Sequence, residues 1–427
     1  MLPVSTPARP GGASAPRARG PLTSTEWRVL VLLTLSALLN YVDRTNLSVG
    51  ATDIQRELGL SNSSLGLLGS AFFWTYAALQ LGGAAGWLVD RWNVCWVYAI
   101  AFLVWSGATA LTGMARVFVV LFGLRLLLGV GESVAYPAFS RILANNFPEH
   151  HRGFANALID AGTKLGPAIG TLAGGLFMKQ FGWRPFFLAL GFGSFLWVFP
   201  WLIWMPRGRG VAARPKQPST AEAPPPLWAI VTRRSAWFTA LGLFCTNYFW
   251  YFLITWLPAY MEKERHFDKS TMAVFGSAAF LAVAVSSVCC GWISDRRIAR
   301  GATPTRVRKS FVGCGLTLAT VVLGMAVIPD NRIAMPLLIL ACAGFGAFSA
   351  NNFAITQTLA GPHAAGKWTA FQNGFANLAG VTAPWVTGWI VDQTHAFYWA
   401  FVAATVIVLC GAACFVVGIG KIEEVEW

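Results

Sequence analysis

An acid and a base stand side by side inside a long apolar stretch near the start of the chain. Asp43 and Arg44 follow the apolar run 27–39 and lie about sixteen residues into that helix, or roughly 24 Å along it. A hydrocarbon core is roughly 30 Å thick, so both charges fall inside the membrane, toward its far side. Each charge there costs roughly 2.5–3.5 kcal/mol, so such residues usually face a bundle interior and mark a pathway. The alternative is an interfacial cap at the helix end, but apolar Leu47 and Val49 continue the helix.

A second acid and base occupy the apolar run 117–142. Arg125 is expected close to the level of Asp43 and Arg44, and Glu132 follows seven residues later, roughly 10 Å nearer the cytoplasm. Arginine holds carboxylates in bidentate geometry and stays charged when desolvated, whereas a buried glutamate without a counter-charge is pushed toward its protonated form. We therefore expect Arg44 and Arg125 to bind an organic anion and Asp43 and Glu132 to couple it to protons. The alternative for Glu132 is a structural hydrogen bond to a neighbouring helix.

A further acid and base lie in the run 154–178. Asp160 and Lys164 are spaced i, i+4, so an intrahelical pair that makes insertion cheaper is the favoured interpretation. If Asp160 pairs elsewhere, Lys164 becomes a second contact for the anion.

Neutral polar side chains inside other apolar runs complete the candidate binding site. They suit the hydroxyl groups of a polyol acid, although polar amides also join membrane helices to one another. The candidates are Tyr41, Tyr76, Gln80, Asn247, Tyr251, Gln372, Asn373 and Asn377.

Composition identifies a polytopic membrane protein. Of the 427 residues, 56% are apolar and only 12% are charged, against roughly 25% in a soluble domain. The net charge of +14 comes from short basic clusters between apolar runs, so no nucleic-acid partner is expected. The eight cysteines lie mostly in apolar segments without metal-ligand or disulfide spacing. The chain shows no His/Cys cluster, P-loop or nucleophile elbow, so we expect no cofactor, no metal and no enzyme activity.

The apolar runs predict an all-α membrane protein with about twelve transmembrane helices in two six-helix halves. The runs are 27–50, 65–89, 94–113, 117–142, 154–178 and 185–205, then 237–260, 272–294, 307–328, 335–360, 368–391 and 397–418. The predicted parts are a disordered tail (1–25), an N-terminal half (26–205), a Pro- and Arg-rich linker (206–235), a C-terminal half (236–419) and a short tail (420–427).

Basic residues predict the orientation in the membrane. With the N-terminus inside, 21 of the 32 Lys and Arg residues fall on inner segments and 8 on outer loops. Both termini are therefore expected in the cytoplasm, in a bacterial inner (plasma) membrane. Residues 1–25 have no apolar core segment, so they are not expected to be a signal peptide.

One short motif occurs twice. Residues 86–92 (GWLVDRW) follow the second apolar run, and residues 291–297 (GWISDRR) follow the eighth, 205 residues later. Parallel six-span halves build alternating access around a midplane site in one class of transporters. We expect a cytoplasmic gate at these loops, formed by Gly86, Asp90, Arg91, Gly291, Asp295 and Arg296.

These motifs resemble the major facilitator superfamily, whose common signature is the doubled Gly-x-x-x-Asp-Arg loop. Within it, residues 40–49 (NYVDRTNLSV) resemble the first helix of the anion:cation symporter family, which carries sugar acids and other organic anions. Further similarity lies in 125–137 (RLLLGVGESVAYP), 256–260 (WLPAY) and 371–377 with Pro384. The chain departs from this pattern at Asp160 and Lys164, where many members have uncharged polar residues.

The residues and the resemblance together predict a secondary transporter that imports a small organic anion, such as a sugar acid or aromatic carboxylate, by proton-coupled symport. An efflux pump for lipophilic or cationic compounds is the alternative, but Arg44, Arg125 and Lys164 favour anions. A receptor without net flux would favour an appended signalling domain, and the chain ends within a few residues of Lys421. Membrane lipid is the other expected partner, and a monomer is expected.

Overall fold

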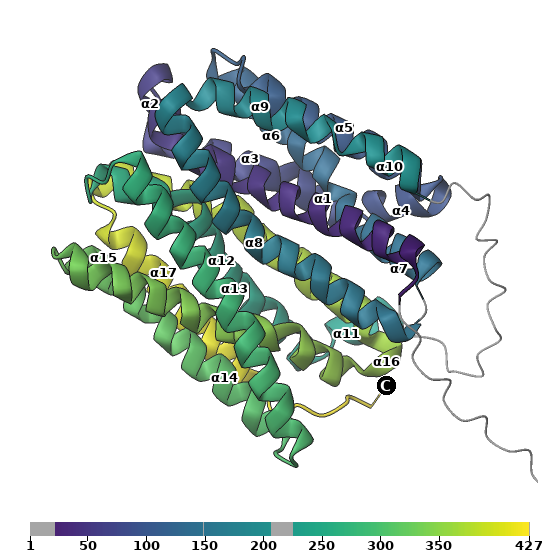
Figure 1. Ribbon diagram of the computed structural model, residues 1–427. Helices are drawn as coiled ribbons and strands as arrows, with labels where there is room; N and C mark the ends of the chain where they lie inside the picture. The colour runs from purple at the N-terminus through teal and green to yellow at the C-terminus, as the bar shows by residue number, and fades with distance from the viewer. Residues whose placement is uncertain (1–21, 148, 206–224, 427) are drawn as a thin grey trace, which may run out of the picture.

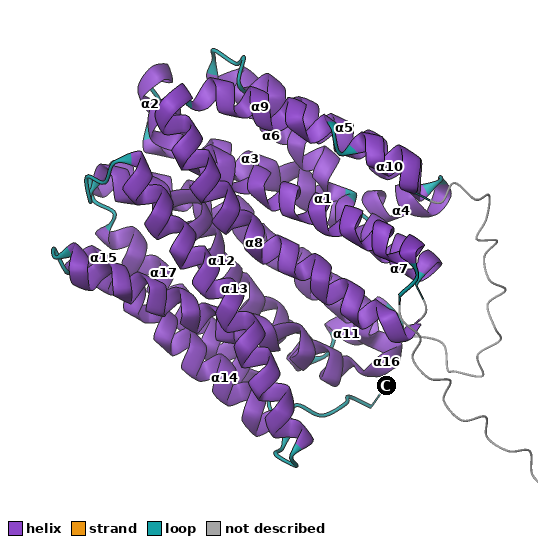
Figure 2. Ribbon diagram, in the orientation of Figure 1, coloured by secondary structure: helices purple, strands orange, loops and turns teal. Residues whose placement is uncertain are grey.

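A computed structural model describes residues 22–147, 149–205 and 225–426, and these residues form helices joined by short loops (Figures 1 and 2). None of the described residues lies in a strand. The first half contains α1 (Ser24–Val49), α2 (Ala51–Leu58), α3 (Asn62–Leu81), α4 (Ala84–Arg91), α5 (Val94–Thr112), α6 (Phe118–Ser133), α7 (Ala135–Asn146), α8 (Glu149–Phe181), α9 (Trp183–Phe195) and α10 (Val198–Trp204). The second half contains α11 (Leu227–Val231), α12 (Arg234–Lys263), α13 (Lys269–Ala299), α14 (Pro304–Ala319), a 3-10 turn (Thr320–Leu323), α15 (Gly324–Val327), α16 (Asn331–Thr394), α17 (Tyr398–Ala413) and a π-helical turn (Cys414–Gly418).

The helices confirm the predicted all-helical membrane fold. Among the described residues, eight helical segments are long and apolar enough to cross a membrane, and α3 with α4 makes a ninth if this bent pair is one span. The three other predicted runs are also helical, in α1, in α8 and in the second part of α16. These are the runs that carry Asp43 with Arg44, Asp160 with Lys164, and Gln372 with its neighbours.

Glycines mark a break inside α16 and the bend between α3 and α4. Gly361 has φ 63° and ψ 177° inside the 64-residue α16, and this conformation suits only glycine. It divides α16 into the segments that correspond to the tenth and eleventh predicted runs. Gly83 has φ 70° and starts α4, whose axis is bent by 60° from that of α3. The bend turns α4 away from the line of α3 at one end of the molecule (Figure 1).

The two halves pack along three helix pairs. Helices α3 and α16, α8 and α13, and α1 and α12 are in contact across the interface between the halves (Figure 1). At Gly66 of α3 a Cβ atom would lie 2.3 Å from the carbonyl oxygen of Pro384, so only glycine allows this approach. Close packing of small residues matters here because lipid supplies no hydrophobic drive for helix association.

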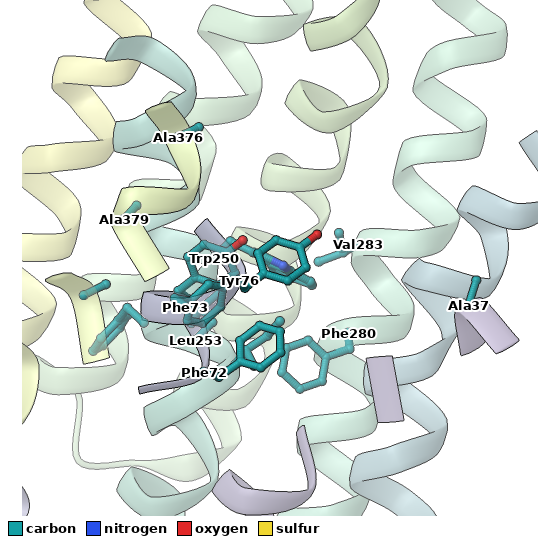
Figure 3. Packing of buried hydrophobic residues seen from close by; sticks show 14 of the residues in the cluster. Ala37, Phe72, Phe73, Tyr76, Trp250, Leu253, Phe280, Val283, Ala376 and Ala379 are labelled. Carbon is teal, nitrogen blue, oxygen red and sulfur yellow. The ribbon is translucent and has the colours of Figure 1, made fainter. Parts of the chain in front are cut away.

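Aromatic side chains fill the space between α3 and α12. Figure 3 shows Phe72, Phe73 and Tyr76 of α3 in one buried cluster with Trp250 and Leu253 of α12. The Phe73 ring lies 4.4 Å from that of Tyr251 on α12. This cluster borders the cavity described below.

The described structure of the two halves extends past the predicted boundaries of the halves. Residues 1–21 of the predicted disordered tail and most of the predicted linker lie outside the described residues, but the end of the linker forms α11, with Ile230 buried. Helix α1 begins at Ser24 because Thr23 and Glu26 form a capping box. In the predicted C-terminal tail, Ile422 is buried and the Val425 amide donates to the Leu359 carbonyl at 2.9 Å. The second half therefore includes residues on both sides of 236–419.

Candidate functional site

A cavity of about 970 Å³ lies between the two halves. Helices α1, α3, α7 and α8 line it from the first half, and α12 and α16 from the second. It extends from Arg44 to Gly86 of α4, Leu227 of α11 and Lys367. We call the end of the molecule that carries α4, α11 and the start of α1 the terminal face (Figure 1). The cavity reaches this face.

The opposite end, which we call the α2 face after helix Ala51–Leu58, is closed by polar contacts between the halves. Lys269 Nζ lies 2.9 Å from Asp53 Oδ2, and Lys263 Nζ donates to Asn62 Oδ1 at 2.7 Å. Farther along this face, Lys179 Nζ lies 2.9 Å from Asp268 Oδ2. All three contacts join one half to the other.

Asp392 makes four hydrogen bonds between the halves on the α2 face. It follows the predicted run 368–391, and its carboxylate accepts from the amides of Asn62 at 3.0 Å and Ser63 at 2.7 Å, in the first turn of α3. It also accepts from Asn62 Nδ2 at 2.9 Å and from Ser63 Oγ. Burial opposes ionisation of Asp392, but the hydrogen bonds from Ser63 and Asn62 outweigh it and hold the pKa below its usual value. A residue of the second half thus caps a helix of the first.

Arg44 lies on the cavity wall in a cage of aromatic rings. Its guanidinium carbon lies 4.7 Å from the ring centroid of Tyr41 and 4.9 Å from those of Phe72 and Tyr76. Arg44 Nε donates to Glu132 Oε2 at 3.0 Å, and both side chains are almost fully buried. Among the described residues, Arg44 Nη2 and Glu132 Oε1 have no hydrogen-bond partner. The pair thus retains one donor and one acceptor for another group.

This ion pair corrects the predicted separation of Glu132 from the arginines. Glu132 was expected roughly 10 Å nearer the cytoplasm than Arg44 and Arg125. A long side chain on a helix leans toward the helix N-terminus, which for α1 is the direction of the terminal face. The length and tilt of the Arg44 side chain therefore bridge the offset in depth.

Asp43 and Arg125, which were expected at nearly the same depth, form no ion pair with each other within the described residues. Asp43 Oδ1 accepts from Thr109 Oγ1 at 2.9 Å and from Asn46 Nδ2 at 3.1 Å, and Oδ2 has no partner in the part of the chain that the structure describes. Within the described ranges, no carboxylate lies within 4 Å of a nitrogen of Arg125, and its Nε has no hydrogen bond. Neither residue lines the cavity. The reason is angular: neighbouring helix positions differ by about 100°, so Asp43 faces α5 when Arg44 faces the cavity.

Lys164 reaches across the cavity instead of pairing on its own helix. Its Nζ donates to Ser349 Oγ on α16 at 3.0 Å. Asp160 Oδ1 accepts from Thr163 Oγ1 at 3.3 Å, and no ion pair joins Asp160 to Lys164 in the part of the chain that the structure covers. The favoured prediction of an intrahelical pair is therefore wrong. The alternative, in which Lys164 is a second contact for the anion, stays a prediction.

Most of the predicted neutral residues line the cavity. Tyr251 OH donates to Asn377 Oδ1 at 3.0 Å, and Gln80 Nε2 donates to the Ser133 carbonyl at 3.3 Å. Gln372 is an exception because it is fully buried and donates to Asn352 Oδ1 at 3.1 Å behind the wall. The predicted neutral residues on the wall are Tyr41, Tyr76, Gln80, Asn247, Tyr251, Asn373 and Asn377.

The predicted gate residues have different surroundings, and they do not form one cluster. Gly86 lines the cavity, and Asp90 Oδ1 lies 3.1 Å from Arg141 Nη1 within the first half. Asp295 has no ion pair within 4 Å among the described residues. Arg91 and Arg296 lie over the rings of tryptophans in their own motifs, Trp87 at 5.8 Å and Trp292 at 4.9 Å. Within the described chain, the two motifs form no ion pair with each other.

Several wall residues were not predicted. Ser349 and Asn352 lie one turn apart on α16, and Trp250 lies next to Tyr251 on α12. Tyr136 OH lies 3.4 Å from Tyr41 OH. The polar pair at i, i+3 within an apolar run was the available signal for Ser349 and Asn352. Of the charged residues on the wall, Arg44, Lys164 and Lys367 are basic and Asp160 is acidic.

Residues 33–367 match the family model of the Major Facilitator Superfamily. The chain belongs to this superfamily. It is 29% identical to the D-galactonate transporter of Escherichia coli O6:H1, over 97% of this chain and 99% of that protein. It is 28% identical to the "Probable galactarate/D-glucarate transporter GarP" of Escherichia coli K12 (94% and 96% covered) and 28% identical to the hexuronate transporter of Bacillus subtilis (88% and 90%).

A solved structure confirms the fold of this superfamily member. A bacterial homologue of the human lysosomal transporter Spinster, in an inward-facing and unoccupied conformation, superposes with a TM-score of 0.79. The match covers 93% of this chain and 98% of that one, at 19% identity. The resemblance inferred from the motifs is thus confirmed, and the chain is an integral membrane transporter.

Proposed function

We propose that this transporter imports a small organic anion with protons, by alternating access of one site to the two sides of the membrane. The observation that carries the proposal is the Arg44–Glu132 pair, buried on the cavity wall with one guanidinium nitrogen unpartnered. Arg44 lines the cavity, so a substrate carboxylate that displaces Glu132 can accept from its guanidinium. The aromatic cage of Tyr41, Phe72 and Tyr76 holds the guanidinium in place and excludes water.

The chemistry of the wall supports an anionic substrate. Of the described residues, three basic ones and one acid line the cavity, and this charge balance disfavours a cationic compound. Asn247, Asn373 and Tyr251 from the second half supply donors and acceptors for hydroxyl groups. Several similar proteins carry the names of sugar-acid transporters, which supports a hydroxylated acid.

Coupling follows from competition for Arg44. A substrate carboxylate that binds Arg44 weakens the hold of the guanidinium on Glu132. A buried carboxylate that loses its counter-charge is costly, so it takes a proton instead. Substrate and proton then occupy the site together, which is the requirement of a symporter.

The closed α2 face supports the access step. With both termini in the cytoplasm, the cavity opens inward and the contacts of Lys263, Lys269 and Asp392 close the outer side. These contacts must separate, and the terminal face must close, for substrate to enter from outside. The two halves move as bodies around the site between them.

The test is transport into proteoliposomes of purified protein, with galactonate as the first probe. An inward-directed proton gradient should concentrate the acid above its external level, and a protonophore should abolish the concentration while exchange continues. Uptake that follows a sodium gradient and ignores the proton gradient would contradict proton coupling. Accumulation of a lipophilic cation, with no organic acid bound, would contradict the anion assignment.

A further inference from the structure

The cavity has a second basic position far from Arg44. We propose that Lys164 and Ser349 form a second anion-binding position, and that the transported acid carries an anionic group at each end. This inference rests on the proposed function, and it narrows the substrate class from acids in general to linear diacids.

The first observation is the position of Lys164. Its ammonium group lies on the cavity wall, and Ser349 Oγ on the facing helix α16 is its one hydrogen-bond partner within the described residues. An ammonium has three donors, so two stay available. Ser349 also brings the Lys164 charge to the interface between the halves, where a bound substrate contacts both.

The second observation is the depth of Lys164 relative to Arg44. Helices α1 and α8 run in the same direction, because added Cβ atoms at Gly162, Gly166 and Gly170 would meet successively later residues of α1. At Gly170 the nearest atoms belong to Val42 and Thr45, which flank Arg44. Lys164 lies six residues before Gly170, which corresponds to a rise of roughly 9 Å.

This axial offset is not cancelled by the side chains. Both side chains lean toward the N-terminus of their own helix, and the two helices are parallel, so both lean toward the terminal face. Arg44 and Lys164 are therefore two cationic positions at different depths in one cavity. A single carboxylate cannot contact both.

A short linear diacid has the required reach. Six carbons in a zigzag with bonds of roughly 1.5 Å span about 6 Å. A charge-assisted hydrogen bond of about 2.8 Å at each end extends this reach past the axial offset. One carboxylate then accepts from Arg44 and the other from Lys164 and Ser349, while the hydroxyl groups between them face Asn247, Asn373 and Tyr251.

The other charges of the wall agree with this placement. Asp160 lies one turn before Lys164 and is exposed, bonded to Thr163 rather than to the lysine. Lys367 lies at the mouth, where its Nζ donates to the Pro225 carbonyl at 2.8 Å. Arg44 is paired with Glu132 in the described structure, whereas Lys164 makes no ion pair among the described residues.

The test is calorimetric binding of acid pairs that differ only at one end. Galactarate and galactonate share a six-carbon chain, and tartrate and threonate share a four-carbon chain. We expect the wild-type protein to bind at least one diacid about tenfold or more tightly than its monoacid, as one added charge-assisted hydrogen bond predicts. Lys164→Gln should remove this preference and leave the monoacid affinity within about twofold.

The matched control removes the same charge elsewhere on the same wall. Lys367→Gln should keep the wild-type ratio of diacid affinity to monoacid affinity. Ser349→Ala should lower this ratio without abolishing monoacid binding. The second position is overturned if Lys164→Gln weakens the binding of both acids equally, or if the wild-type protein prefers neither diacid over its monoacid. In either case, galactonate transport would still support the proposed function. A wild-type protein that binds no organic acid contradicts both.

Discussion

Replacing Asp392 with alanine should open the α2 face. The carboxylate accepts four hydrogen bonds from Asn62 and Ser63, and all four join the second half to the first. They exist only while the halves touch at this face. The change therefore destabilises the closed state and leaves the open state unaffected.

The magnitude follows from the capping geometry. Removing a side-chain cap from a helix N-terminus costs about 0.5–2 kcal/mol, and Asp392 takes this role for α3 across the interface. The equilibrium between closed and open should then shift by roughly 2- to 30-fold. Helix α3 itself should stay folded, because Ser61 Oγ accepts from the Ser64 amide at 3.0 Å within the first half.

The assay is a distance measurement by pulsed electron resonance in liposomes. Spin labels at Arg56 and Gln393, both exposed on the α2 face, report the separation of the halves. The exposed native cysteines have to be replaced first; they are Cys289, Cys314 and Cys410. Asp392→Ala should increase the long-distance fraction relative to the wild-type sequence.

Glu264 supplies the matched control. Its Oε1 accepts from the Phe397 amide at 2.6 Å, so it is also a carboxylate that holds a backbone N–H at this face, but both partners belong to the second half. Glu264→Gln should leave the distance distribution unchanged. An unchanged distribution for Asp392→Ala, or an equal shift in both variants, would refute the gating role of the Asp392 contacts.

The pH dependence of closure has a definite sign. The pKa of Asp392 is lowered in the closed state, so its contribution to closure is fully present above the ordinary aspartate value of about 3.9 and is lost as pH falls through the lower value. This group should therefore leave closure unchanged between pH values of about 8 and 5. A loss of closure in that range, in the wild type but not in Asp392→Ala, would show that Asp392 titrates there.

Three further variants test the wall. Arg44→Lys keeps the charge but loses the planar fork, so substrate affinity should fall by about tenfold or more, and near-normal calorimetric affinity would remove Arg44 from the site. Glu132→Gln should bind and exchange substrate yet fail to concentrate it under a proton gradient; full accumulation by this variant would move coupling to Asp43. Gln372→Ala leaves buried partners unsatisfied, so it should lower the free energy of unfolding by about 1–3 kcal/mol and leave substrate affinity unchanged. Asn373→Ala should lower substrate affinity and leave the free energy of unfolding unchanged.

The class of the protein follows from the sequence alone. Apolar runs of membrane-spanning length, the basic residues between them and the repeated motif at 86–92 and 291–297 are local patterns, and physical rules for the bilayer translate them directly into helices. Charged residues inside apolar runs can also be recognised from the sequence alone. Because an ionised side chain in hydrocarbon is costly, Arg44 and Glu132 stood out as functional candidates before any contact was known.

The pairing of these charges was decided only by the tertiary structure. Each helix position advances by about 100°, so an error of one residue in facing exchanges a wall residue for a buried one, as with Gln372 and Asn373. The partners of Arg44 and Lys164 lie 88 and 185 residues away in the chain. Such contacts depend on the depth and rotation of two helices relative to each other, which local spacing does not specify. For this reason the sequence identified the charged groups of the cavity, and the packing of α1, α6, α8 and α16 determined which of them meet.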